Sequence, residues 1–307
     1  MEAEHLHEFG GEILIEALAL TLLSVSLVAG FLGALVGIGG GVIIVPVLST
    51  ILHVPIKETV AASLVCVIAT SIASSSRYIP KGLVNVRLAL FLEVAAAVGA
   101  SIGAFTAAYA PSPALHISLG LVLVVLSLLQ FKGIRLEDEM LRRGVFSEVV
   151  EDRLAKEFKL SSEYYDERFK VKVKYNVTKS SHGLAASWAA GLMSGFLGLG
   201  GGSFNVPLMN KLMKVPVKVA VATSQIMVGL TASIGASVFM SLGLLDPFMI
   251  APMVIGVALG STLGALVMNK LRASAIKAVF GLLLACLAYL SFSRGLALLL
   301  GVALPGV

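Results

Sequence analysis

The chain has 307 residues, of which 57% are hydrophobic and only 13% are charged, and its mean hydropathy is +0.96. Soluble globular proteins carry about 25% charged residues, so this composition excludes a soluble class and predicts an all-α, multi-pass membrane protein. The net charge of +5 does not indicate nucleic-acid binding, because Lys and Arg fall in short loops and in one central segment that also holds acids.

Four apolar units follow an acidic amino-terminal segment. Residues 1–12 contain acids but no Lys or Arg, so a cleaved secretory signal is not expected. The units cover residues 13–52, 59–79, 88–109 and 114–131, and each can cross a hydrocarbon core about 30 Å thick. Residues 37–41 (GIGGG) interrupt the first unit, and consecutive glycines cannot continue a stable helix. We therefore expect a helix broken inside the membrane, as in transporter binding sites.

Two ionisable residues of the first half allow more than one interpretation. Glu93 lies inside an apolar unit, where it either takes up a proton or a cation during transport, or pairs with a base such as Arg87, or reaches the interface by snorkelling. Arg77 follows three serines at the end of its unit. It either attracts anions to the inner mouth of the pathway or is an ordinary cytoplasmic anchor.

A charged insert separates the two apolar halves. Residues 132–181 contain 12 Lys or Arg and 10 Asp or Glu, which cannot enter a bilayer. Within it, residues 136–158 have helical spacing of apolar side chains, and residues 169–175 alternate apolar and basic side chains like a strand. We expect a structured tether on the cytoplasmic side, with a regulatory or assembly role left open.

The second apolar half repeats the first at an offset of 161 residues. Between residues 29–63 and 190–224, 14 of 35 positions are identical, and the glycine segment recurs as residues 198–202 (GLGGG). The halves thus form two membrane repeats, residues 1–131 and 182–307, on either side of the insert. Glycines 256, 260 and 264, mirrored by glycines 99 and 103, are spaced as helix contact faces. Cys66 and Cys286 lie in apolar units and are expected to be buried, with no metal site.

Loop charges predict that the repeats face opposite ways. The loop at residues 77–87 holds three basic residues and its counterpart at 237–248 holds none, whereas residues 110–116 hold none and their counterpart at 271–277 holds two. The positive-inside rule then requires an odd number of segments in each repeat. Five segments result if each glycine-broken unit is a re-entrant hairpin, which gives ten in all. This topology puts the insert in the cytoplasm and the amino terminus outside.

The two glycine breaks predict one anion site near the middle of the membrane. Each short helix after a break begins with free backbone N–H groups and a positive dipole end, which bind anions. Hydroxyl and amide side chains nearby can add donors, although serine also packs between helices and Gln225 can hydrogen-bond between helices instead. The expected substrate-binding residues are Gly39, Gly40, Gly41, Ser63, Gly200, Gly201, Gly202, Ser203, Asn205, Thr223, Ser224 and Gln225.

The chain resembles a known family. The doubled Gly-x-Gly-Gly-Gly-x-x-x-x-Pro element, each copy followed by Val-Pro-x-Lys, is similar to the sulfite exporter TauE/SafE family in both halves but not in the insert. The resemblance implies a multi-pass plasma-membrane permease for small sulfur-containing anions such as sulfite or organosulfonates, usually an exporter. Val42 and Ile44 stand where the second copy has Ser203 and Asn205, so the second half should dominate substrate recognition.

We therefore expect a secondary transporter that exports such an anion by alternating access. A passive anion channel and an importer of a related oxyanion are the alternatives. An enzyme is not expected, because no Ser-His or paired-carboxylate arrangement stands at membrane depth and neither glycine segment has the Gly-Lys-Ser/Thr ending of a P-loop. The expected partners are the anion and the bilayer, without cofactor, metal or nucleic acid. The anion's identity, the coupling ion, the direction and any homo-oligomer stay open.

Overall fold

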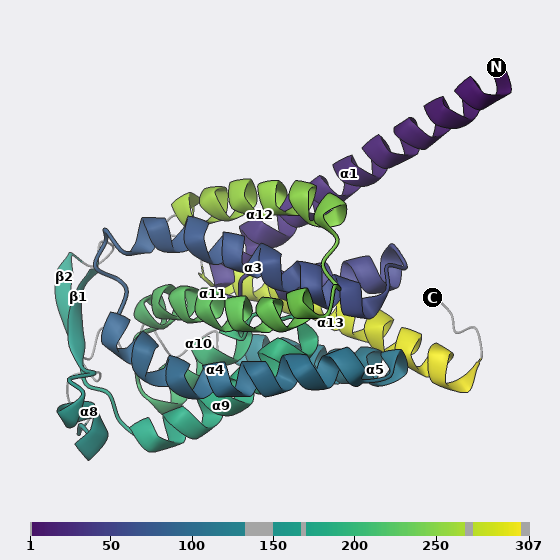
Figure 1. Ribbon diagram of the computed structural model, residues 1–307. Helices are drawn as coiled ribbons and strands as arrows, with labels where there is room; N and C mark the ends of the chain where they lie inside the picture. Colours follow the sequence, from purple (N-terminus) through teal and green to yellow (C-terminus); the bar gives the residue numbers. More distant parts are fainter. Residues whose placement is uncertain (1, 133–149, 167–169, 268–272, 302–307) are drawn as a thin grey trace.

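The computed structural model describes residues 2–132, 150–166, 170–267 and 273–301, which form a helix bundle with a β-hairpin at one end (Figure 1). Its first half contains α1 (Glu2–Val36), α2 (Gly41–Pro46), the π-helical turn η1 (Val47–Ile51), α3 (Ile56–Tyr78), α4 (Val86–Tyr109) and α5 (Ser112–Lys132). Its second half contains α9 (Ser180–Leu197), α10 (Gly202–Pro207), η2 (Leu208–Leu212), α11 (Val217–Ser241), α12 (Pro247–Val267) and α13 (Ala273–Leu300).

The helices recur with the offset found in the sequence. From α2 to α5, every helix or π-helical turn begins 161 residues before its counterpart in the second half, and α1 ends 161 residues before α9 ends. Even the π-helical turns recur, each directly after a proline, because proline lacks the N–H that an α-helical turn would use. The two halves therefore have the same secondary structure.

Seven of the described helices are long and apolar enough to cross a membrane: α1, α3, α4, α5, α11, α12 and α13. Between residues 41 and 51, α2 and η1 form a shorter apolar helix. The architecture is thus an all-α, multi-pass membrane protein, as the composition predicts. The count of ten membrane segments, which needs α9 and both short helices as well, stays a prediction.

Small residues bring equivalent pairs of helices into close contact. α12 packs along α1, where a Cβ at Gly256 would collide with the Leu23 carbonyl oxygen and one at Gly264 with that of Phe31. α4 packs along α9 in the same way, with Gly99 against Trp188 and Gly103 against Leu192. Both glycine series are therefore helix contact faces, as their spacing predicts, and both pairs run parallel.

In two further pairs, a helix packs antiparallel against its own counterpart in the other repeat: α3 against α11, and α5 against α13. Along α3 and α11, Ser71 lies against Gly229 and Leu64 against Gly235. Along α5 and α13, Gly120 lies against Phe292, and Ser127 Oγ donates a hydrogen bond of 2.9 Å to the Gly281 carbonyl.

The described part of the insert is a short helix and a hairpin. α8 (Arg153–Glu157) precedes β1 (Ser162–Asp166) and β2 (Val171–Tyr175), which pair antiparallel with Ser162 opposite Tyr175. The strand predicted in residues 169–175 is therefore present as β2. The helix predicted over residues 136–158 falls mostly outside the described residues, and α8 lies within its last part.

Polar contacts attach the insert to one end of the bundle. Asp166 is buried and pairs with Lys218 Nζ at 3.0 Å, at the start of α11. Asn85, which caps α4, donates to the hydroxyl of Tyr175 at 2.8 Å. Asp152 accepts a hydrogen bond of 2.6 Å from the Ser180 N–H. Burial raises the pKa of Asp152, but the hydrogen bonds from Ser180 and from Ala155 outweigh burial and lower it overall.

Cys66 is buried in α3, but Cys286 is exposed on α13, so the prediction of burial is wrong for Cys286. Leu282 and Tyr289, one turn away on either side of Cys286, are also exposed. The face of α13 that carries these residues therefore points away from the bundle. An apolar sequence cannot distinguish such a face from a buried one.

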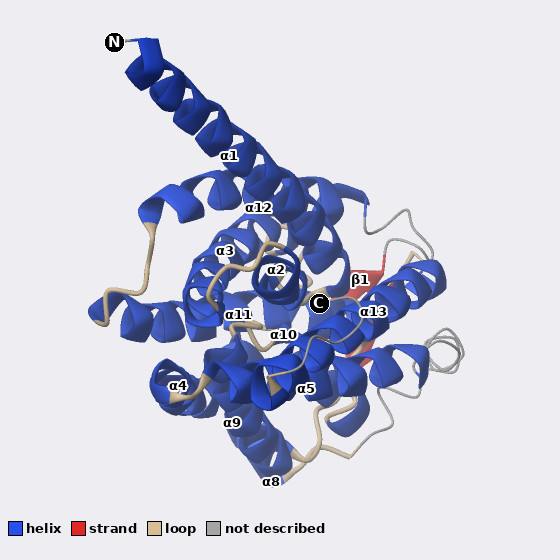
Figure 2. Cartoon of the chain, turned by 90° about the vertical axis from the view of Figure 1, so that its right-hand side faces the viewer, coloured by secondary structure: helices blue, strands red, loops and turns tan. Residues whose placement is uncertain are grey.

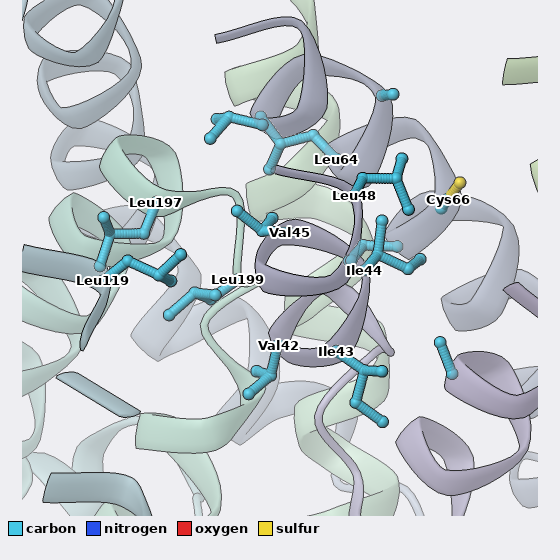
Figure 3. Packing of buried hydrophobic residues seen from close by; sticks show 14 of the residues in the cluster. Val42, Ile43, Ile44, Val45, Leu48, Leu64, Cys66, Leu119, Leu197 and Leu199 are labelled. Atoms are coloured by element: carbon cyan, nitrogen blue, oxygen red, sulfur yellow. The ribbon is translucent and has the colours of Figure 1, made fainter. Parts of the chain in front are cut away.

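The two short helices lie in the middle of the bundle. Viewed along the bundle, α2 and α10 are surrounded by the long helices (Figure 2). Every side chain of α2 is buried, and Figure 3 shows Val42, Ile44 and Val45 in one cluster with Leu199 of the second glycine segment. The core of the molecule is thus built around the two glycine breaks.

Candidate functional site

The glycine segments take up backbone conformations that favour glycine. Gly37, Gly39 and Gly40 have φ between 80° and 84°, and their counterparts Gly198, Gly200 and Gly201 have φ between 70° and 74°. Side chains other than glycine rarely adopt such angles, so these residues allow α1 and α9 to end and the chain to turn into α2 and α10. The predicted helix breaks are therefore present in both halves.

The two segments also cross each other. A Cβ at Gly41 would lie 2.5 Å from the Gly198 carbonyl oxygen, and one at Gly202 would collide with the Gly37 carbonyl oxygen. Both contacts put a carbonyl of one repeat against the start of the short helix of the other. Two segments that are far apart in the sequence thus meet at the centre of the molecule.

A pair of equivalent serines holds the crossing together. Ser63 Oγ on α3 donates 2.7 Å to the Gly198 carbonyl, and Ser224 Oγ on α11 donates 3.0 Å to the Gly37 carbonyl. Both serines are buried. In this arrangement their hydroxyls are bonded to the protein, so their predicted contact with a substrate stays a prediction that requires these bonds to open.

Two valines line the crossing. A Cβ at Gly39 would lie 2.9 Å from Val228 Cγ1, and one at Gly200 would lie 2.6 Å from Val67 Cγ1. Val67 and Val228 are equivalent residues of α3 and α11 and both are buried. Any side chain larger than hydrogen at these glycines would have to displace one of them.

The two halves of the crossing differ in polarity. Around the second glycine segment stand Ser194, Ser203 and Asn205, which are at most 5% exposed. Ser194 Oγ, Ser203 Oγ and Asn205 Oδ1 have no hydrogen-bond partner among the described residues. At the equivalent positions the first half has Gly33, Val42 and Ile44. Buried polar atoms normally have partners, so each of these three atoms could hydrogen-bond a polar ligand.

Ser194 was not among the residues singled out from the sequence. A Cβ at Gly201 would lie 3.5 Å from Ser194 Oγ, which puts this hydroxyl beside the glycine segment. Gly33, the counterpart of Ser194 in the first repeat, packs so tightly on Gly40 that a side chain at residue 33 would collide with the Gly40 N–H. The offset of 161 residues pairs Gly33 with Ser194, so a comparison of the two copies before the glycines would have found it.

Thr223 and Gln225 have partners within the protein. Thr223 Oγ1 accepts 3.0 Å from the backbone N–H of Asn85, and Gln225 Oε1 accepts 2.9 Å from Ser74 Oγ on α3. The second contact is the interhelical hydrogen bond that the sequence left as an alternative for Gln225. Its Nε2, however, has no partner among the described residues.

The structure puts Glu93 and Arg77 in different surroundings. Glu93 is buried in α4, and its Oε1 accepts a hydrogen bond of 2.7 Å from Thr231 Oγ1 of α11. It forms no salt bridge within the described chain, and Arg87 is exposed, so the pairing with Arg87 that the sequence left as an alternative is absent there. Arg77 is exposed in the last turn of α3, at the end of the bundle that carries the insert (Figure 1).

Comparison with known proteins identifies the family of this chain. The family model for Sulfite exporter TauE/SafE matches residues 22–290. The chain belongs to this family. A relative from Bacillus subtilis (strain 168), named "Probable membrane transporter protein YunE", is 28% identical over 271 residues, which cover 86% of this chain and 93% of the relative. No solved structure matches the chain.

Membership of the TauE/SafE family makes this chain a membrane transporter. The match at residues 22–290 includes both glycine segments and the polar group around Gly201. The family assignment and the bundle of apolar helices agree on a multi-pass membrane protein.

Proposed function

We propose that this protein is a secondary transporter that exports a small sulfur-containing anion, sulfite or an organosulfonate, across the plasma membrane by alternating access. The observation that carries the proposal is that buried polar atoms of Ser194, Ser203 and Asn205, near the second glycine segment, have no hydrogen-bond partner among the described residues. The name of the family, sulfite exporter TauE/SafE, supports the choice of anion.

The chemistry of this group suits a small oxyanion. Hydroxyls donate to the oxygens of sulfite, and an amide donates through Nδ2 and accepts through Oδ1, which fits an oxyanion that carries one proton, such as hydrogen sulfite. The start of the helix formed by α10 and η2 adds backbone N–H groups and the positive end of its dipole. Glycine at residues 200–202 lets an oxygen come close to the backbone.

Alternating access needs two related halves that face opposite ways. The antiparallel contacts of α3 with α11 and of α5 with α13 support an inverted arrangement, because equivalent helices then run in opposite directions. We assign residues 1–131 and 182–307 to the two repeats. The basic loops and the insert at residues 132–181 lie on the cytoplasmic side and the amino terminus lies outside.

Alternating access requires a conformational change, and we assign this change to the crossing of the glycine segments. In the described arrangement Ser63 and Ser224 tie each repeat to the glycine carbonyl of the other. Opening toward one side of the membrane exchanges one of these bonds for contacts with the anion. The predicted substrate contacts of Gly39, Gly40, Gly41, Ser63, Gly200, Gly201, Gly202, Thr223, Ser224 and Gln225 belong to such an open state.

The test is sulfite transport by purified protein in proteoliposomes. Ser203→Val and Asn205→Ile copy the residues of the first repeat, and we expect each to lower the rate about tenfold or more, since an unmet hydrogen bond to a charged group costs roughly 1.5–3 kcal/mol. Ser237→Ala is the control, because this exposed hydroxyl bonds only to its own helix, at Ser233.

Three outcomes would contradict parts of the proposal. Unchanged transport by both variants would remove the polar group from the substrate site. Transport that never exceeds equilibration, whatever ion gradient is applied, would indicate a passive channel. Uptake into cells that outweighs release would indicate an importer.

A further inference from the structure

A buried carboxyl group of α4 has no counter-charge among the described residues. Glu93 is 7% exposed and lies about 10 Å along α4 from its start, at ~1.5 Å per residue. Its Oε1 accepts from Thr231, whereas its Oε2 has no hydrogen-bond partner among the described residues. Ionised carboxylates are rarely buried in this way, because an uncompensated charge in an apolar site costs several kcal/mol.

The helices packed on α4 offer no cation to this carboxyl. α9 and α11 contain one titratable side chain each, His182 and Lys218, and both stand in the first turn of their helix. Arg87 of α4 is exposed, and so are Lys156 and Lys159, which flank the Phe158 that packs on Phe91 of α4. His182 is exposed, and Lys218 pairs with Asp166 of the insert. A proton on Oε2 is therefore the simplest way to neutralise Glu93.

The partner of Glu93 connects it to the glycine crossing. Thr231 follows Val228 by about one turn of α11, and Val228 is one of the two valines that line the crossing. A second hydrogen bond, from the Asn85 N–H to Thr223, joins α4 to α11 two turns earlier. α4 is thus hydrogen-bonded to α11 at Thr223 and at Thr231. In the sequence of α11, Ser224 and Gln225 lie between these two residues.

The second repeat lacks an equivalent group. The counterpart of Glu93 is Val254, and the counterpart of Thr231 is Thr70, whose hydroxyl bonds to the Cys66 carbonyl of its own helix. The carboxyl is therefore not required by the fold of the repeat. Its presence in one half only, beside the crossing, points to a function.

We propose that Glu93 is a proton-binding site, with Thr231 as its positioning residue, which couples the movement of the anion to one proton moving in the same direction. This proposal rests on the proposed function. The proton binds to Oε2 and leaves when the opening of the crossing admits water. Because the anion and an ionised Glu93 repel each other in a low-dielectric interior, the anion-loaded molecule carries the proton.

Proteoliposomes loaded with sulfite and a pH indicator test the coupling. In the natural protein we expect more protons to move with each sulfite than the ionisation of sulfite itself accounts for. Glu93→Gln keeps the size and the hydrogen bond to Thr231 but cannot release a proton. This variant should still move sulfite down its gradient, with the additional proton movement lost. Equal proton movement per sulfite in both proteins would overturn the proposal.

Infrared spectroscopy tests the proton site without a substrate. At neutral pH we expect a carbonyl band of a protonated carboxylic acid that is absent in Glu93→Gln, shifted in Thr231→Val and unchanged in Glu163→Gln, whose carboxyl is on the surface of the insert. Absence of this band in the natural protein would overturn the proton site. Failure of the natural protein to move sulfite, with the band present, would overturn the proposed function instead.

Discussion

Serine and glycine residues determine how the two repeats meet. Ser63 and Ser224 each donate to a carbonyl of the opposite glycine segment, and Gly41 and Gly202 allow those carbonyls to approach the short helices. These residues form two symmetric contacts. Ser194, Ser203 and Asn205 add polar atoms to one side only. Symmetric contacts thus build the crossing, and the second half alone adds the polar atoms that we propose bind the anion.

Gly202→Ala should disrupt the crossing. Gly202 is the first residue of α10 and does not have a positive φ, so any loss must come from the collision of the new Cβ with the Gly37 carbonyl. We expect a loss of about 1–3 kcal/mol of stability and of most sulfite transport. Thermal unfolding and proteoliposome flux measure the two effects.

Gly243→Ala is the matched control for this variant. Gly243 has a φ of 69° and nothing within 4 Å of a new Cβ, so alanine there costs only the backbone strain of about 1 kcal/mol. Transport should persist in this variant. A Gly202→Ala protein that is as active as the natural protein would show that the close approach is unnecessary.

At the scale of elements, the insert and α11 form a unit. The hairpin packs on the starts of α4 and α11, and its buried Asp166 pairs with Lys218. The equivalent lysine of the first repeat, Lys57, instead donates 2.8 Å to the Ala108 carbonyl at the end of α4. The insert therefore supplies a partner to a lysine that both repeats possess.

Asp166→Asn should loosen the insert from the bundle. Removal of one member of a buried ion pair costs about 3–5 kcal/mol, and we expect less here, because Lys218 is 33% exposed and water can solvate it. Limited proteolysis should cleave the hairpin faster in this variant. Glu163→Gln, which removes exposed pairs with Lys172 and Lys174, should be cleaved like the natural protein. The opposite order of cleavage rates would contradict the role of Asp166.

At the scale of the whole molecule, helices of one repeat pair with helices of the other. α1 packs with α12, α4 with α9, and α3 and α5 with their own counterparts α11 and α13. Neither half can therefore bury its contact faces without the other. The two short helices lie inside this arrangement, and the insert lies at one end of it (Figures 1 and 2).

Cysteine labelling should place equivalent loops on opposite sides of the membrane. Pro80 and Ser241 are related by the offset of 161 residues, and both are exposed. In a protein without Cys66 and Cys286, a membrane-impermeant thiol reagent added to intact cells should label Ser241→Cys but not Pro80→Cys. Lys172→Cys in the insert should behave like Pro80→Cys. Labelling of Pro80→Cys and Ser241→Cys from the same side would contradict inverted repeats.

The sequence by itself determined the membrane class, the duplication, the helix breaks and the strand of the insert. These features follow from local composition and spacing: long apolar runs, consecutive glycines and an alternation of apolar and basic residues. A comparison of the two copies also predicted that the second would be the more polar, since Ser203 and Asn205 replace Val42 and Ile44.

Only the tertiary structure decided which groups meet. The contacts of Ser63 with Gly198 and of Glu93 with Thr231 join residues more than 130 positions apart, and no local pattern specifies them. The same holds for the exposed face that carries Cys286 and for the position of Ser194 beside Gly201. In an apolar chain nearly every helix face is compatible with burial, so packing against the other repeat decides which residues lie inside.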